Sequence, residues 1–174
     1  TGSAKMDKFV RDHQDKLACD FSLISDGEVK AGRLVIDAGF RGGFNATLTV
    51  TTSHTDLHSG LYGGATPNAS WVLSLFLAGL HDDRNVVAID HFYDEVDSVN
   101  DEVKTQNLSI PFSEKEFQRL SGTKALKLPE GGDFFTQTGL QPTVEITGIE
   151  SGYTGVGYKN AIPGSAQAKI NFRL

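Results

Sequence analysis

Three segments of this chain alternate apolar and polar side chains, and that alternation restricts the fold more than any other feature. A period of two residues is typical of a β-strand with one buried and one exposed face. Strands buried on one side favour an antiparallel sheet with helices on a single face, and therefore an α+β fold. The apolar members of the three segments are Phe44, Ala46, Leu48 and Val50, then Val144 and Ile146, then Ala166, Ala168, Ile170 and Phe172.

The strongest helix signal runs from about residue 67 to residue 81. Thr66 is a suitable N-cap, and Pro67 suits the first helical position, where its missing N–H costs little. A first apolar stripe, expected to pack on the sheet, comprises Ala69, Val72, Leu73, Phe76, Leu77 and Leu80. A second stripe comprises Trp71, Leu75 and Ala78. Two partners suit this second stripe equally well: another subunit, or a flanking loop of the same chain.

Two further segments have helical patterns. Residues 4–18 repeat apolar side chains at helical spacing, and the short apolar runs 21–24 and 34–36 follow them. This α/β piece is small for a domain and suggests the remnant of a larger one. Residues 113–120 begin with a capping-box pattern, Ser113 followed by Glu116.

Composition excludes several classes of protein. The chain has 174 residues, is 39% hydrophobic and has a formal net charge of −6. Its apolar content is sufficient for a core, and its acidity argues against binding nucleic acid. A single cysteine excludes an intramolecular disulfide framework. No membrane span or signal peptide is evident, so we expect a soluble globular protein from a reducing compartment.

Local patterns single out three side chains, each with an ordinary alternative. His58 lies where a strand gives way to a glycine-rich loop, and loops of this kind often bear function. Asp26 ends the 21–24 apolar run, at a place where α/β sheets often bind ligands. Arg173 is suited to binding a carboxylate with two hydrogen bonds. The alternatives are a surface histidine, an Asp-Gly turn and a solvated strand face.

Four segments together resemble M20 metallopeptidases in order and spacing, and are most similar to the cytosolic nonspecific dipeptidase and carnosinase-like branch. The His-Ser-Gly-x-Tyr-Gly-Gly stretch is the most specific element, and the resemblance covers essentially the whole chain. The segments are Leu23–Asp26, Gly39–Gly42, Asp56–Gly64, and Lys159–Pro163 with the closing Phe172–Leu174.

This resemblance implies a domain organisation. Residues 1–37 would be a short α/β remnant of a zinc-binding catalytic domain. Residues 38–174 would be a ferredoxin-like lid and dimerisation domain, a four-stranded antiparallel sheet with two helices on one face. The implied parent enzyme is a cytoplasmic homodimer that hydrolyses dipeptides or releases C-terminal residues with two zinc ions. Neither nucleic acid nor a membrane is an expected partner.

The resemblance also implies roles for particular residues. Asp26 matches a metal ligand. His58 matches a histidine that reaches the partner subunit's active site and stabilises the tetrahedral intermediate. Arg173 matches the residue that binds the substrate's terminal carboxylate. Asn160 matches a substrate-contacting position that is commonly threonine in the family.

The other metal ligands and the general base of the family are absent from these 174 residues. We therefore expect this chain by itself to bind zinc poorly and to be catalytically inert. The alternating strands alone also allow a different class of function, because this fold serves many. That alternative is a stand-alone ferredoxin-like module that binds a small ligand or mediates association without catalysis.

Overall fold

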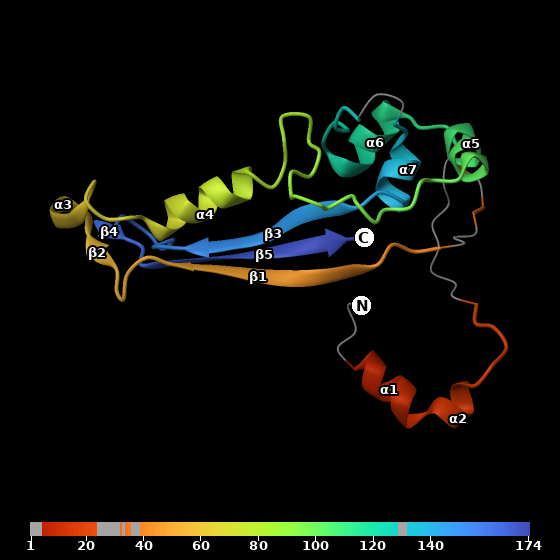
Figure 1. Ribbon diagram of the computed structural model, residues 1–174, viewed down its shortest axis with the longest axis horizontal. Coiled ribbons are helices and arrows are strands. Elements are labelled where there is room, and N and C mark those ends of the chain that lie inside the picture. The colour runs from red at the N-terminus through yellow and green to blue at the C-terminus, as the bar shows by residue number, and fades with distance from the viewer. Residues whose placement is uncertain (1–4, 24–31, 33, 36–38, 129–131) are drawn as a thin grey trace. The chain divides into compact units, whose positions relative to one another are not determined.

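The computed structural model describes residues 5–23, 32, 34–35, 39–128 and 132–174. The chain forms two compact units, Thr1–Asp37 and Ala38–Leu174, each described separately below and drawn in Figure 1. None of the helices in the described ranges has the length and apolar character needed to cross a lipid bilayer.

The first unit contains two short helices, α1 (Met6–Asp12) and α2 (Gln14–Leu17). The continuous helix predicted over residues 4–18 is wrong, because His13 leaves helical geometry with φ −129° and ψ 22°. Neither helix buries a residue, so burial of side chains does not favour one continuous helix across His13. Phe21 and Leu34, which begin the two apolar runs predicted above, are exposed and outside any strand. Ile24 and Ile36, which end these runs, lie outside the described residues.

The second unit is built on the three alternating segments, which form one antiparallel sheet as predicted. Its strands are β1 (Gly43–Thr51), β3 (Thr143–Ser151) and β5 (Ser165–Arg173), with β5 in the centre. The β1–β5 register is unbroken from Gly43 opposite Arg173 to Thr51 opposite Ser165. The β3–β5 register shifts once, between Ile146 and Gly148.

Among the described residues, the four-stranded sheet that the family resemblance implied is not found. Instead β2 (Leu57–His58) and β4 (Ala161–Ile162) form a separate two-stranded sheet. Pro163 separates β4 from β5, and proline has no N–H to donate to a ladder. The backbone of Gly164 then turns away from β4 to accept a hydrogen bond from the Thr52 N–H at 2.8 Å. The ladder is therefore interrupted between the two sheets.

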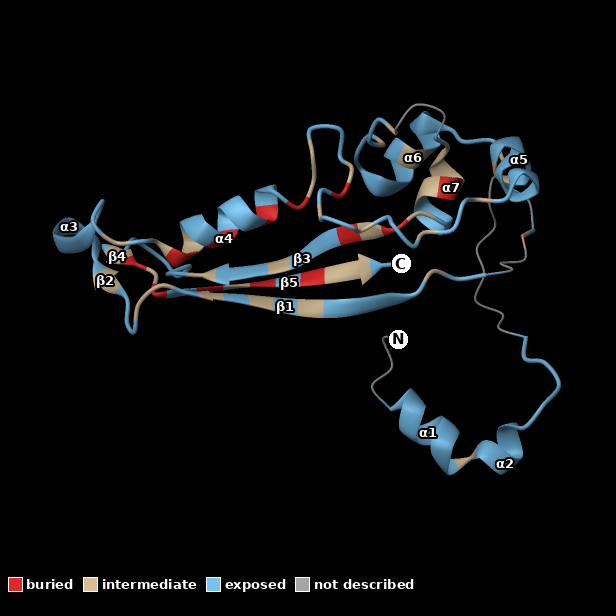
Figure 2. Cartoon of the chain, viewed as in Figure 1, coloured by how far each residue is buried: buried red, intermediate tan, exposed pale blue. Residues whose placement is uncertain are grey.

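Helix α4 (Ala69–Ala78) packs on one face of the three-stranded sheet. Figure 2 shows the buried residues where α4 faces β3 and β5. The small side chains of Ala166 and Ala168 let α4 lie against the central strand. The core consists of Ala69, Leu73, Leu77, Leu80, Val87, Val144, Ala166, Ala168 and Ile170.

The start of the predicted helix and part of its packing stripe are wrong, since α4 begins at Ala69 and Pro67 precedes its N-cap. The N-cap is Asn68, whose side-chain oxygen accepts hydrogen bonds from the N–H groups of Ser70 and Trp71. Thr66 instead donates its hydroxyl to the Tyr62 carbonyl. Val72 and Phe76, predicted in the packing stripe, lie outside the core with 36% and 52% of their surfaces exposed. The side of α4 that faces the narrow sheet offers only about one residue per turn.

The second stripe of α4 is uncovered. Trp71 is 62% exposed and Leu75 is 59% exposed. Within the described residues no loop of this chain covers them, so the flanking-loop alternative finds no support. This surface, formed by Trp71, Leu75 and Phe76, is called the outer face of α4 below.

Helix α3 (Ser59–Tyr62) follows β2 and lies beside β2 and β4. The remaining helices, α5 (Asp101–Ser109), α6 (Glu114–Ser121) and α7 (Phe134–Gly139), form a separate group at the other end of the sheet. Ser113 caps α6 by accepting from the Glu116 N–H, as predicted. Helix α6 buries no residue. It contributes Phe117 to an aromatic cluster with Phe112 and Phe134, so it does not supply the predicted second helix on the sheet.

Candidate functional site

His58 lies at the end of the molecule formed by β2, β4 and α3. Its backbone pairs with Ala161 in the short two-stranded sheet, and its side chain is exposed. The Gly60 N–H donates a hydrogen bond to Nδ1 of the His58 ring at 3.0 Å, so the imidazole caps α3. The ring is therefore oriented by its own helix and is accessible from outside the fold.

This hydrogen bond assigns the tautomer of the ring. Because Nδ1 of His58 accepts a hydrogen bond, the neutral imidazole has its proton on Nε2. Nε2–H is then a donor on the side of the ring away from Gly60. A positioned N–H donor of this kind can stabilise negative charge that develops on a substrate oxygen.

Asn160 lies at the same end of the molecule. The Ser59 N–H donates to the backbone carbonyl of Asn160 at 2.9 Å, which joins the residue after His58 to the residue before β4. The side chain of Asn160 is exposed. Asp56 fixes this end to the start of β5, because its Oδ1 accepts from the Gly164 N–H at 3.0 Å. The structure thus brings His58 and Asn160 together.

Arg173 lies at the opposite end of the sheet, on the face that α4 does not cover. It is the last residue of β5 and pairs with Gly43 on β1 and Thr143 on β3. A Cβ atom placed on Gly43 would lie 3.4 Å from Cδ and 3.7 Å from a terminal guanidinium nitrogen of Arg173. The Arg173 side chain therefore extends over Gly43, where no side chain obstructs it.

Arg41 lies beside Arg173 and was not among the predicted site residues. One terminal nitrogen of its guanidinium donates to the Gln141 carbonyl at 2.9 Å and lies 3.4 Å from Oγ1 of Thr143. Partial burial, together with the positive charge of Arg173, lowers the pKa of Arg41. Arg41 belongs to the Gly39–Gly42 segment of the family resemblance, but its place beside Arg173 follows only once the strand register is known.

His58 and Arg173 are too far apart to act on one small molecule within one chain. Nine residues of β5 separate the Arg173 end from the Ser165 end, which is roughly 26 Å at the usual rise of a strand. His58 lies beyond Ser165, as Figure 1 shows from the places of β2 and the C-terminus. A dipeptide spans roughly 7 Å. The two side chains therefore cannot contact the same dipeptide within one copy of the chain, and the surroundings of each are called a candidate half-site below.

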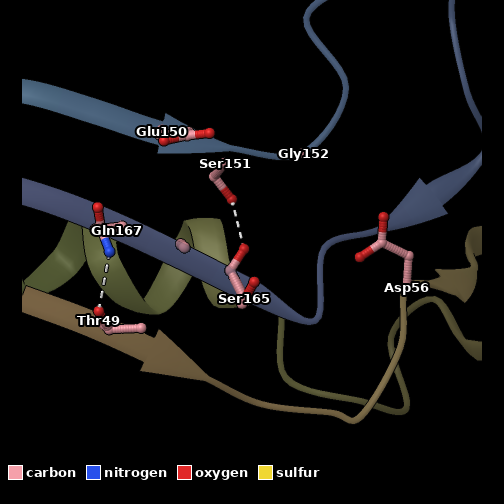
Figure 3. A pocket seen from close by; sticks show the side chains of 8 residues that line it. Thr49, Asp56, Glu150, Ser151, Gly152, Ser165 and Gln167 are labelled. Carbon is pink, nitrogen blue, oxygen red and sulfur yellow. Dashed lines mark hydrogen bonds between the residues drawn. The ribbon is translucent and has the colours of Figure 1, made fainter.

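A polar cavity of about 380 Å³ lies at the His58 end of the sheet. Figure 3 shows Asp56, from the loop before β2, across from Glu150 and Ser151 at the end of β3. Most of its polar groups already have partners: Ser151 donates to the Ser165 carbonyl, and Gln167 donates to Thr49. The cavity contains none of the predicted site residues.

The described residues do not fit a metal centre. Across these ranges no three His, Cys, Asp or Glu side chains are close enough to bind a metal ion together. Asp26, the predicted ligand, lies outside the described residues. A two-metal centre needs several ligands and a bridging carboxylate, so no reaction step through a metal is derived from this chain.

Known proteins resemble the chain along its whole length. A β-Ala-His dipeptidase from Rattus norvegicus is 26% identical over 176 residues, which cover 99% of this chain and 36% of the relative. A Cys-Gly metallodipeptidase from Saccharomyces cerevisiae is 25% identical and matches 99% of this chain and 37% of its own length. The chain therefore spans little more than a third of these relatives.

A solved structure has the same fold. An M20 family metallo-carboxypeptidase from Sulfolobus solfataricus superimposes with a TM-score of 0.82 and 28% identity, over 99% of this chain and 45% of that protein. The family model described as the peptidase dimerisation domain matches residues 41–174. This match includes both half-sites and the sheet that joins them, and so the chain belongs to the M20 peptidase dimerisation domain family.

Proposed function

We propose that this chain is the lid and dimerisation part of a longer, homodimeric M20 peptidase that hydrolyses dipeptides or releases C-terminal residues. In this proposal residues 38–174 are the lid, and residues 1–37 belong to the catalytic domain from which it extends. The relatives support it, since two are named dipeptidases and one a carboxypeptidase. The proposal includes a cytoplasmic location and two zinc ions, which residues beyond the described ones would bind, with Asp26 among the ligands.

The separation of His58 from Arg173 is the observation on which the proposal rests. If both residues contact one short peptide, they must come from two copies of the chain, because roughly 26 Å of strand lies between them in one copy. His58 and Asn160 would then reach together into the site of the partner subunit. Arg173 would bind a substrate in the site of its own subunit.

The local chemistry of each half-site suits its proposed role. The Nε2–H group of His58 would donate a hydrogen bond to the oxygen on which negative charge develops during peptide hydrolysis. The guanidinium of Arg173 would bind the terminal carboxylate of the substrate with two hydrogen bonds. Asn160 would contact the substrate through its side-chain amide, which both donates and accepts hydrogen bonds.

The outer face of α4 is the surface that we propose for dimerisation. Trp71, Leu75 and Phe76 are each more than half exposed, and exposed apolar patches of this kind often mark protein interfaces. The face belongs to the segment that the dimerisation-domain model matches. Burying this surface between two copies would bring the lids together without occupying either half-site.

A complementation experiment tests the two-copy arrangement. Two variants of the full-length protein that contains this chain, His58→Ala and Arg173→Ala, are assayed for dipeptide hydrolysis singly and after co-expression. In a mixed dimer one active site has both defects and the other has neither. With random pairing of subunits, half of the dimers are mixed, so we expect about a quarter of the wild-type activity to return.

Two controls make the result decisive. Co-expression of either variant with itself should restore nothing. Recovery of activity would contradict the alternative that the chain is a stand-alone module without catalysis. If the mixture forms dimers but no activity returns, His58 does not act in the partner's active site. Retention of full activity by Arg173→Ala would contradict the carboxylate-binding role separately.

A further inference from the structure

Arg41 and Arg173 lie on the same face at the same end of the sheet. Arg173 and Thr143 are directly opposite each other in the β3–β5 register, so their side chains point to the same face. The guanidinium of Arg41 reaches that face, since it contacts Oγ1 of Thr143. Both arginines are therefore beside one register position of β3.

Arg41 occupies two hydrogen-bond acceptors at the start of β3 and just before it. The Gln141 carbonyl and the Thr143 hydroxyl both bond to Arg41 and not to Arg173. The positive charge of Arg41 also repels a second guanidinium from the same place. The open direction for the Arg173 side chain is then over Gly43, which is where it lies.

We propose that Arg41 is a positioning residue for Arg173, holding the Arg173 guanidinium over Gly43 so that it can bind the free carboxylate of a peptide substrate. This inference depends on the proposed carboxylate-binding role of Arg173. Arg41 also adds a second positive charge to the same end of the sheet, which favours an anionic ligand over a neutral one. The ligand class is a peptide or acyl-amino acid with an ionised carboxylate.

The neighbouring charges support this arrangement. The repulsion between the two guanidiniums is part of what lowers the pKa of Arg41. An anion between two adjacent cations relieves such repulsion. Arg41 also joins the segment before β1 to the start of β3 through its contacts with Gln141 and Thr143. These contacts restrict the Thr143 side chain and the Gln141 backbone together.

The test compares two substrates that differ in one group. KM and kcat of the full-length protein are measured for a dipeptide with a free carboxylate and for the same dipeptide as its C-terminal amide. The variants are Arg41→Gln, Arg41→Lys and Arg173→Gln. The matched control is Arg119→Gln, because Arg119 is exposed on α6 and pairs only with its helix neighbour Glu116 among the described residues.

We expect Arg41→Gln to raise KM for the free carboxylate roughly 3- to 10-fold, the scale of one partly exposed ionic interaction, with little change for the amide. Arg173→Gln should raise KM for the free carboxylate more, on the order of 100-fold. Arg41→Lys keeps the charge and should recover part of the loss. Arg119→Gln should leave all constants unchanged.

Equal effects of Arg41→Gln on the acid and the amide would overturn the inference, because a merely structural role does not distinguish the two substrates. Thermal unfolding of each variant shows whether it folds, and Arg41→Lys provides the second measurement if Arg41→Gln does not. An effect of Arg173→Gln without one of either Arg41 variant refutes only the positioning role. No effect of Arg173→Gln refutes the carboxylate-binding role of Arg173 in the proposed function, on which this inference depends.

Discussion

The two ends of the β1–β5–β3 sheet hold their candidate side chains in different ways. At one end His58 is oriented by a hydrogen bond from Gly60, two residues away in the sequence. At the other end Arg173 is surrounded by Gly43, Thr143 and Arg41, which come from two other strands and the segment before β1. The first arrangement is local, and the second depends on strand register. This difference predicts that the two ends respond differently to substitution.

The largest expected effect comes from a substitution in the core between α4 and the sheet, which both ends share. Leu73 is 1% exposed between α4 and the sheet, so Leu73→Ala leaves a cavity and should lower the free energy of unfolding by about 2–5 kcal/mol. Urea denaturation of this chain measures the change. The control is Leu120→Ala on α6, where 70% exposure predicts a change within about 0.5 kcal/mol.

Equal changes for Leu73→Ala and Leu120→Ala would contradict the position of the core. Loss of order should also appear at both ends of the sheet in the Leu73 variant, because α4 packs on β5, which runs from one end of the sheet to the other. Amide hydrogen exchange of the two ends is the measurement that separates this outcome from a local effect.

Two glycine substitutions sharpen the comparison. An added Cβ at Gly43 would lie 2.8 Å from the Phe172 carbonyl oxygen, a backbone atom that cannot move without disturbing the β1–β5 ladder. Gly43→Ala should therefore cost about 1–3 kcal/mol of unfolding free energy, similar to other overpacked sites. It should also displace the Arg173 side chain. Urea denaturation and the NMR signal of the Arg173 Nε–H group measure both effects.

Gly60→Ala is the matched change at the other end. Its added Cβ would lie 2.8 Å from Cε1 of the His58 ring, a side chain that can rotate away. We expect the free energy of unfolding to change by less than about 0.5 kcal/mol, while the His58 ring signals in NMR shift because its orientation is lost. A larger loss of stability at Gly60 than at Gly43 would reverse the comparison.

The last substitution concerns the connection between the His58 end and the sheet. Asp56→Ala removes the acceptor of the Gly164 N–H, and Gly164 is buried. Loss of one such hydrogen bond should cost about 1 kcal/mol, measured by urea denaturation. The control is Asp97→Ala, at an exposed position outside any helix or strand, and a similar cost there would mean that the Asp56 contact adds no stability.

Much of the fold follows from local sequence patterns. The period-two segments became β1, β3 and β5, and Ser113 caps α6 as its pattern indicated. The predicted fourth strand of the main sheet is not found among the described residues, where β2 and β4 pair with each other and not with an edge of that sheet. Residues 161–162 alone do not reveal this pairing. The N-cap of α4 was misplaced by two residues because two capping side chains, Thr66 and Asn68, compete in one segment.

The candidate site was predicted in part. The motif resemblance selected His58, Asn160 and Arg173, and the structure places the first two together and the third at the far end of the sheet. Asp26 lies outside the described residues and remains a prediction. Arg41 was overlooked because its relevance depends on contacts with Gln141 and Thr143, which are about a hundred residues away in the sequence.

The sequence by itself determined which side chains face each side of the sheet, because alternation along a strand is a local consequence of backbone geometry. It also determined the orientation of the His58 ring, which needs only a neighbour two residues away. Only the tertiary structure decided which residues meet across strands, since pairing register joins positions far apart in the chain. For that reason the distance between His58 and Arg173, and the placement of Arg41 beside Arg173, appeared only with the folded sheet.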